Sequence, residues 1–97
     1  MTVAIFGNIY PQHFSKYIQH LIKRLENENI NLIIEQKFNE FLQKDIRFNK
    51  SVQTFSNHQE LKDNADFLFS IGGDGTLLKA VTYIQDSEIP VLGVNTG

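Results

Sequence analysis

The chain has 97 residues, a formal net charge of −2 and no cysteine; 41% of its residues are hydrophobic and 21% are charged. These values fit one globular domain and exclude disulfides and thiol catalysis. The charge offers no basic field for nucleic acid, and no apolar run approaches the ~20 residues that a membrane span needs.

The first third of the chain predicts a strand, a helix and a second strand. The apolar run from Val3 to Phe6 is typical of a strand covered on both faces, and it breaks at Gly7. Pro11 suits the first turn of a helix, and "ENENI" ends that helix with an asparagine suited to a left-handed terminal position. The second strand is "NLIIEQ", so the unit is a βαβ unit with an expected right-handed crossover. Apolar side chains at spacings of three and four predict the buried stripe of the helix: Phe14, Tyr17, Ile18, Leu21, Ile22 and Leu25.

Residues 36–55 do not favour one structure. "FNEFL" indicates a helical turn, whereas Ile46 and Phe48 alternate as in a strand. Asn57, with Glu60 three residues later, predicts a capping box and a short helix that runs to Leu61.

The last third predicts a strand, a glycine-rich turn, a helix and a final strand. The segments are "FLFSI", "GGDG", "TLLKAVTYIQ" and "PVLGV". The alternation predicts the α/β class, with an open, mostly parallel Rossmann-like sheet and flanking helices, in a single domain over residues 1–97. The side chains expected to face the sheet from the last helix are Leu77, Leu78, Val81 and Ile84.

A carboxylate, Asp74, lies inside the glycine-rich turn. Gly72, Gly73 and Gly75 let the backbone turn and bring amide groups close to a ligand. The helix that follows directs its N-terminus, with roughly +0.5 of a charge, at the same place. The turn therefore predicts an anion site at the carboxyl end of a strand.

Asp74 does not fit a site for phosphate alone. Two like charges ~4 Å apart repel by about 4 kcal/mol at an effective dielectric near 20, more than the ~0.3–1 kcal/mol that a helix end offers an anion. Two explanations stay open: a cation such as Mg²⁺ lies between carboxylate and phosphate, or a hydroxyl donates a hydrogen bond to Asp74 and becomes the nucleophile. Both are typical of phosphoryl transfer, where such a carboxylate accepts a proton. The structural alternative is a tight turn in which Asp74 only caps the helix.

"IGGDGTLLKA" followed by "IPVLGVNTG" resembles the NAD kinase family, whose members use ATP or inorganic polyphosphate. Residues 72–76 match its GGDGT motif, and residues 93–97 match its G-[IV]-N-x-G loop. The resemblance implies transfer of a phosphoryl group, with Mg²⁺, to the 2′-hydroxyl of the adenosine ribose of NAD⁺, giving NADP⁺. It implies that Asp74 is the catalytic proton acceptor and that Lys79 contacts a phosphate. The further nucleotide-binding residues that it implies are Gly72, Gly73, Gly75, Thr76 and Asn95.

The family pattern continues beyond this sequence into a β-rich C-terminal domain that carries most NAD contacts. The resemblance thus implies an N-terminal domain that is inactive alone and part of a homo-oligomer in the full-length protein. The first residues lack the basic segment of a signal peptide, so a cytoplasmic location without membrane or nucleic-acid partners is expected. No metal-ligating residues are expected, because His13, His20 and His58 lack a metal-binding spacing.

Three alternatives remain at this point. Lipid kinases and 6-phosphofructokinases share the GGDG turn, although "VLGVNTG" matches neither the Gly-Thr-Gly-Asn-Asp segment of the former nor the Pro-Gly-Thr-Ile-Asp segment of the latter. A nucleotide-binding module without catalysis is the third alternative, because a fold does not fix a function.

Overall fold

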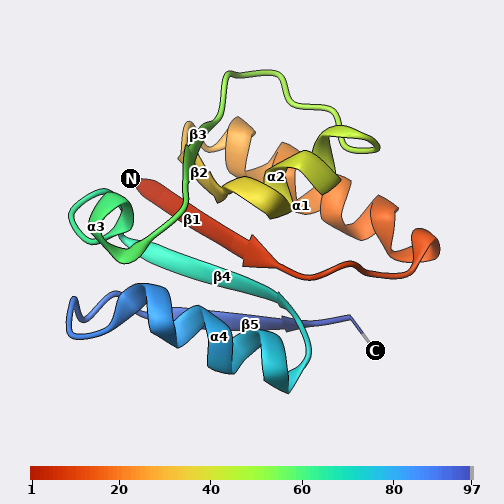
Figure 1. The fold of residues 1–97 in the computed structure, drawn as a ribbon. Coiled ribbons are helices and arrows are strands. Elements are labelled where there is room, and N and C mark those ends of the chain that lie inside the picture. The colour runs from red at the N-terminus through yellow and green to blue at the C-terminus, as the bar shows by residue number, and fades with distance from the viewer. Residues whose placement is uncertain (97) are drawn as a thin grey trace.

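The computed structural model describes residues 1–96 and contains one five-stranded, parallel sheet in the order β3-β2-β1-β4-β5 (Figure 1). The predicted α/β class with an open, parallel sheet is therefore confirmed. None of the helices in this part of the chain is long and apolar enough to cross a membrane. In chain order the elements are β1 (Thr2–Gly7), the 3-10 turn η1 (Gln12–Phe14), α1 (Ser15–Asn27), β2 (Asn31–Glu35), α2 (Gln36–Gln43), β3 (Gln53–Phe55), α3 (His58–Leu61), β4 (Phe67–Gly72), α4 (Asp74–Ile84) and β5 (Val91–Asn95).

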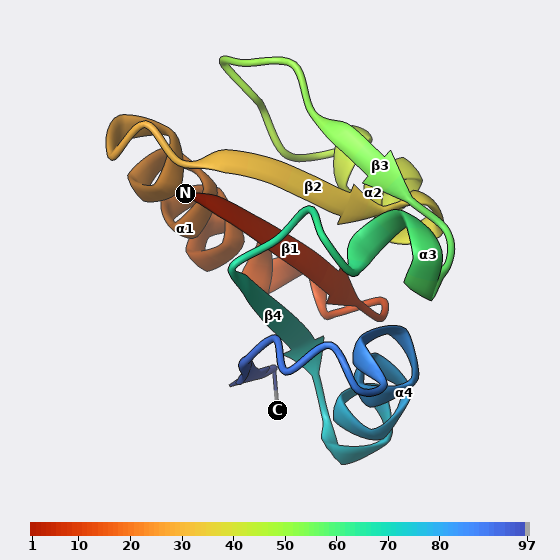
Figure 2. The same cartoon turned by 90° about the vertical axis from the view of Figure 1, so that its left-hand side faces the viewer.

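The helices cover the sheet from both sides. From β1 the chain moves outward to β2 and β3, and from β4 it moves the opposite way to β5, so right-handed crossovers place the helices on opposite faces. Figure 2 shows α4 on one side of the sheet and α1 on the other. On the face covered by α1 and α2, here the α1 face, the core includes Ile5, Ile18, Ile34, Leu42 and Ile71. On the opposite α4 face it includes Ala4, Phe6, Phe55, Leu61, Leu68 and Ala80.

The predicted asparagine at the end of α1 and the predicted start of α3 at Asn57 are confirmed. Asn29 has a φ of 60°, its N–H donates to Glu26 O at 3.0 Å, and the Ile30 N–H donates to Leu25 O at 3.1 Å. This pair of hydrogen bonds is the Schellman motif, which satisfies the last carbonyls of α1. At the start of α3 the Asn57 side chain accepts the Glu60 N–H at 3.0 Å. Only half of the predicted capping box forms, because the Glu60 carboxylate accepts the N–H of Ser56 at 2.7 Å and not that of Asn57.

The ambiguous middle segment contains a helix and a short strand. The helical turn is α2, but Ile46 and Phe48 lie in a loop, so the alternating pattern there does not form a strand. The Glu26 carboxylate fixes this loop, because it accepts the N–H groups of Asn49 and Lys50 at 2.7 and 3.0 Å. The strand β3 was not predicted, since it has only three residues and only its last, Phe55, is buried.

The prediction of which α4 residues face the sheet is largely wrong. Leu78 and Val81 are 72% and 50% exposed, and Leu77 lies at the margin beside Gly93 of β5. The buried stripe is instead Thr76, Ala80 and Ile84, of which only Ile84 was predicted. These three residues recur every four positions, so the small side chains of Thr76 and Ala80 let the helix pack closely on β4.

Candidate active site

The glycine-rich turn connects the end of β4 to the start of α4. Gly72 has a φ of 152°, and a Cβ atom there would lie 2.5 Å from Oγ1 of Thr76, whose side chain is only 8% exposed. Gly72 therefore requires glycine for the fold itself. At Gly73 and Gly75 a Cβ atom would meet nothing within 4 Å, so the backbone there is open to a ligand.

Asp74 is the first residue of α4, and its side chain is exposed. The N-cap position belongs to Gly73, and no side chain forms a capping hydrogen bond there. Within residues 1–96 no hydrogen bond or ion pair engages the Asp74 carboxylate. The alternative in which Asp74 only caps the helix is therefore wrong for this structure, and the carboxylate is available to a ligand.

The two motif segments lie side by side. Asn95 is in register with Gly72 across the β4–β5 pair, and the Thr96 N–H donates to Gly72 O at 3.2 Å. Parallel pairing thus brings Asn95 to the same edge of the sheet as Asp74. Gly97, the last residue of the second motif, lies outside the described residues.

A groove of about 1030 Å³ runs along this carboxyl edge of the sheet. It lies where the strand order reverses between β1 and β4, the position at which ligands bind in open α/β sheets. Four of the predicted site residues line it, namely Gly73, Gly75, Thr76 and Lys79, whereas Gly72, Asp74 and Asn95 do not. Other lining residues are Phe6, Gly7, Asn8, Ile9, Glu35, Gln36, Lys37, Phe38, Glu40, Phe41, Lys44, Ser56 and Tyr83.

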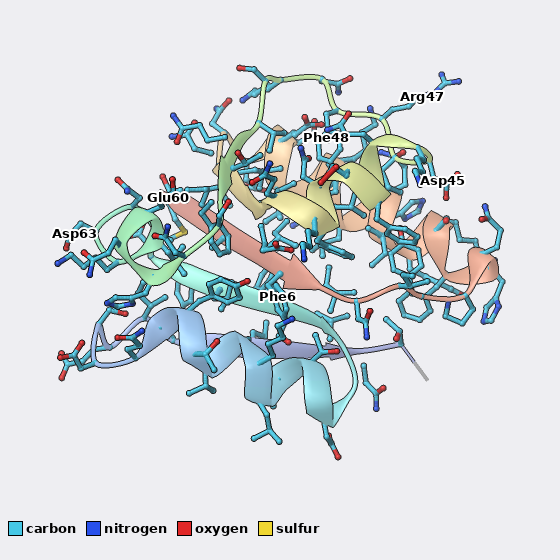
Figure 3. All side chains as sticks on the ribbon, in the orientation of Figure 1. Phe6, Asp45, Arg47, Phe48, Glu60 and Asp63 are labelled. Atoms are coloured by element: carbon cyan, nitrogen blue, oxygen red, sulfur yellow. The ribbon has the colours of Figure 1, made fainter. Side chains whose placement is uncertain are left out.

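An aromatic cluster forms the α4 side of the groove. Phe6, at the end of β1, lies between β1 and α4 (Figure 3), and its ring centroid is 5.2 Å from that of Tyr83. The Lys79 ammonium is 6.0 Å from the Phe6 ring centroid, and within the described part of the chain no carboxylate pairs with it. Burial, and to a lesser extent the charge of Glu35, raises the pKa of the Tyr83 hydroxyl. That hydroxyl therefore stays protonated near neutral pH and can donate a hydrogen bond.

The opposite wall comes from the β2–α2 junction. The buried Glu35 carboxylate accepts the N–H groups of Lys37 and Phe38 at 3.1 and 3.0 Å, which caps α2. Phe38 packs against Gly7, where a Cβ atom would lie 2.5 Å from Cζ of the ring. Lys37 and Lys44 add positive charge to the same wall.

No sequence motif marks this wall, so most of its residues were not predicted as part of the site. Gly7 was expected only to end the first strand, yet Gly7, Asn8 and Ile9 line the groove. The available signal was general: the carboxyl ends of parallel strands meet at one edge, so the residues after β1 and β2 had to lie near the glycine turn.

Neither a second hollow nor a cluster of metal-ligating side chains indicates an active site elsewhere in residues 1–96. A second hollow of about 510 Å³ lies at the amino ends of the strands, where residues such as Thr2, Asn31 and Asp66 line it. Open α/β sheets bind ligands at the other edge. Among residues 1–96 no three His, Asp or Glu side chains gather as a metal site would require.

Comparison with known proteins decides the family. The sequence family described as the ATP-NAD kinase N-terminal domain matches residues 3–97. This chain belongs to the NAD kinase family. The match covers nearly the whole chain, so the resemblance noted for its last third extends to the N-terminus, and the lipid kinase and phosphofructokinase alternatives are excluded.

Relatives and a solved structure agree with this membership. Over 97 residues the chain is 37% identical to the NAD kinase of Christiangramia forsetii and 39% identical to those of Flavobacterium psychrophilum and Bacteroides fragilis. Each alignment covers 100% of this chain but only 33% of the relative, so the chain spans about a third of their length. The crystal structure of yeast NADH kinase complexed with NADH matches with a TM-score of 0.77 at 21% identity, over 100% of this chain and 31% of that one. This last likeness supports the fold.

Proposed function

We propose that the chain is the N-terminal domain of a longer NAD kinase. The complete enzyme transfers a phosphoryl group from ATP, or from polyphosphate, to the 2′-hydroxyl of the adenosine ribose of NAD⁺ and forms NADP⁺. The support is the family membership, the name NAD kinase that the relatives carry, and their threefold greater length. A β-rich C-terminal domain, a homo-oligomeric state and a cytoplasmic location belong to the same proposal.

One observation carries the proposal: the Asp74 carboxylate is exposed beside the groove and is bound by no other group of residues 1–96. The 2′-hydroxyl of a bound dinucleotide donates a hydrogen bond to Asp74 and transfers its proton there as the oxygen attacks the terminal phosphorus of the donor. The bond from that phosphorus to the oxygen of the departing ADP, or of the shortened polyphosphate, breaks. We expect Asn95, which is in register with Gly72, to contact the same nucleotide.

The neighbouring groups favour binding of phosphate. The open backbone at Gly73 and Gly75 and the N-terminus of α4 supply amide donors and a partial positive charge. Lys79, without a carboxylate partner in the described chain, supplies a full charge one turn farther along α4. Together they act against the repulsion that Asp74 exerts on a nearby phosphate.

Magnesium fits the site as a companion of the nucleotide. Mg²⁺ is commonly held by substrate phosphates with only one or two carboxylates, so the lack of a three-ligand cluster in residues 1–96 does not conflict with its use. Asp74 and Glu40, the exposed carboxylates beside this groove, would hold one of the waters of the ion. When bound, the ion neutralises charge on the transferring phosphoryl group.

The test is Asp74→Asn in the full-length enzyme. Removal of the proton acceptor should lower kcat by about 10²–10⁴-fold and leave the KM values for NAD⁺ and ATP within a few-fold. Asp86→Asn, at an exposed aspartate beyond the far end of α4, is the matched control and should retain full turnover. Initial rates of NADP⁺ formation measure both variants, with NADH as a second acceptor and polyphosphate as a second donor.

A nucleotide-binding module without catalysis makes a different prediction. Such a protein would bind NAD⁺ or ATP in its full-length form but would form no NADP⁺ before any substitution. Equal turnover of the Asp74→Asn and Asp86→Asn enzymes would instead remove the catalytic role of Asp74.

A further inference from the structure

An apolar surface lies on the α1 face of the sheet, away from the groove. We name it the β5 patch and define it by Phe14, Tyr17, Leu21, Leu92 and Val94. A hollow of about 340 Å³ opens between α1 and Val94, and all its lining side chains are apolar or aromatic. Leu92 lies outside this lining, two residues before Val94 on the same strand. Tyr17 and Leu92 are 55% and 56% exposed. Contiguous exposed apolar surface of this kind marks an interaction site.

The topology explains why the patch is uncovered. On the α1 face, the core beneath α1 and α2 includes side chains of β1 and β2 and reaches β4 at Ile71, whereas on β5 Val94 packs only against its margin. The helix that follows β4, α4, lies on the other side of the sheet (Figure 2). Leu92 is in register with Phe69, which packs against the α1-face core, so Leu92 points to the same side. A helix that continued outward from β5 through a right-handed crossover would lie on the α4 face and would leave the patch open.

We infer that the β5 patch is the docking surface for an apolar segment from the remaining two thirds of the full-length protein. The relatives are about three times as long as this chain, so they contain ample polypeptide to cover it. A next element that extends the sheet through a right-handed crossover lies on the α4 face, so we expect the docking segment to come from farther along the chain and to fold back over β5 and α1. This inference rests on the proposal that the chain is one domain of a longer protein, but not on the chemistry assigned to Asp74.

The experiment compares two single variants, each with one new negative charge, at the two ends of one row of residues that pair across the sheet. Leu92, Phe69, Ile5, Ile34 and Thr54 are successive register partners from β5 to β3. Leu92→Glu places a carboxylate in the patch. Thr54→Glu places one at the exposed opposite end of the row and is the matched control. Each substitution is made in the 97-residue chain and in the full-length protein.

Thermal unfolding distinguishes the outcomes. In the full-length protein, Leu92→Glu should lower Tm by at least about 5 °C relative to Thr54→Glu, because a buried carboxylate loses its hydration. In the 97-residue chain the two variants should unfold within about 2 °C of each other, since Leu92 is half exposed there. Hydrogen exchange adds a direct measure: backbone amides of β5 should exchange at least about tenfold more slowly in the full-length protein.

Three results would overturn the inference. An equal Tm for both full-length variants means that nothing covers the patch. A 97-residue chain that dimerises, and becomes monomeric with Leu92→Glu, assigns the patch to a second copy. A gene that encodes no residues after Gly97 leaves no segment to dock. All of these readouts are independent of kinase activity, so a failure here differs from a failure of the proposed reaction.

Discussion

Gly72 and Gly73 are neighbours in one turn, but glycine is needed at each for a different reason. Gly72 has a φ of 152°, and a Cβ atom there would clash with the side chain of Thr76. Gly73 has extended backbone, and a Cβ atom there would project into open space. The first position is a requirement of folding. At the second position we expect glycine to be needed for access, because a side chain there would project into the open space proposed for the phosphate.

The two alanine variants should therefore behave oppositely. Gly72→Ala should destabilise the chain by about 1–3 kcal/mol, since both the φ angle and the contact with Thr76 oppose a Cβ atom. Gly73→Ala should leave stability within about 0.5 kcal/mol but weaken nucleotide binding by the full-length enzyme. Urea unfolding of the 97-residue chain and titration of the full-length enzyme with ATP measure the two effects. Similar stability losses in both variants would contradict this division.

The chemistry of single residues in the sequence predicted part of the candidate site. Asp74 was singled out because its charge conflicts with a simple phosphate site, and the structure shows it exposed at the end of β4. Its catalytic role, like the nucleotide contacts of Lys79 and Asn95, stays a prediction. Phe6 and Tyr83 carried no such signal, since buried aromatic residues are common in any core.

At the scale of elements, α2 depends on a cap from the strand before it. Glu35 is buried and satisfies two N–H groups at the helix start. Glu35→Ala should destabilise the 97-residue chain by about 1–2 kcal/mol, because the donors lose their acceptor. Glu35→Gln should recover part of this loss, since its amide oxygen still accepts a hydrogen bond. Glu40→Ala, at an exposed position of the same helix, is the control; an equal loss in denaturant midpoint there would refute the capping role.

The elements differ in how far their sequences reveal them. The strands β1, β2 and β4 could be predicted from the sequence, because their central residues are buried and therefore form continuous apolar runs. The edge strand β3 is short and mostly exposed, so it leaves no pattern. On α4 the large residues Leu78 and Val81 suggested the wrong buried face, because close packing on β4 selected Thr76 and Ala80 instead.

At the scale of the whole molecule, the strand order determines where the site lies. β4 pairs with β1 rather than with β3, so the turn after β4 comes to lie beside the loop after β1. Local sequence patterns do not encode this pairing, which depends on how side chains distant in the sequence pack in the cores on both faces of the sheet. The glycine turn was predictable from its own motif, whereas the other wall of the groove could be inferred only from the general rule that the carboxyl ends of parallel strands meet at one edge.

The groove also explains why the domain should not act alone. A ligand pocket normally encloses ~70–90% of a ligand's surface, whereas this groove lies along one open edge of a chain that spans 33% of its relatives. We expect the 97-residue chain to form no NADP⁺ and to bind NAD⁺ with a Kd above about 100 µM, an affinity of less than ~5.5 kcal/mol. Calorimetric titration measures the affinity, and amide chemical shifts at residues 73–79 identify the site. Binding of NAD⁺ with a micromolar Kd would show that these residues alone complete the dinucleotide site, and the contribution assigned to the rest of the enzyme would have to be abandoned.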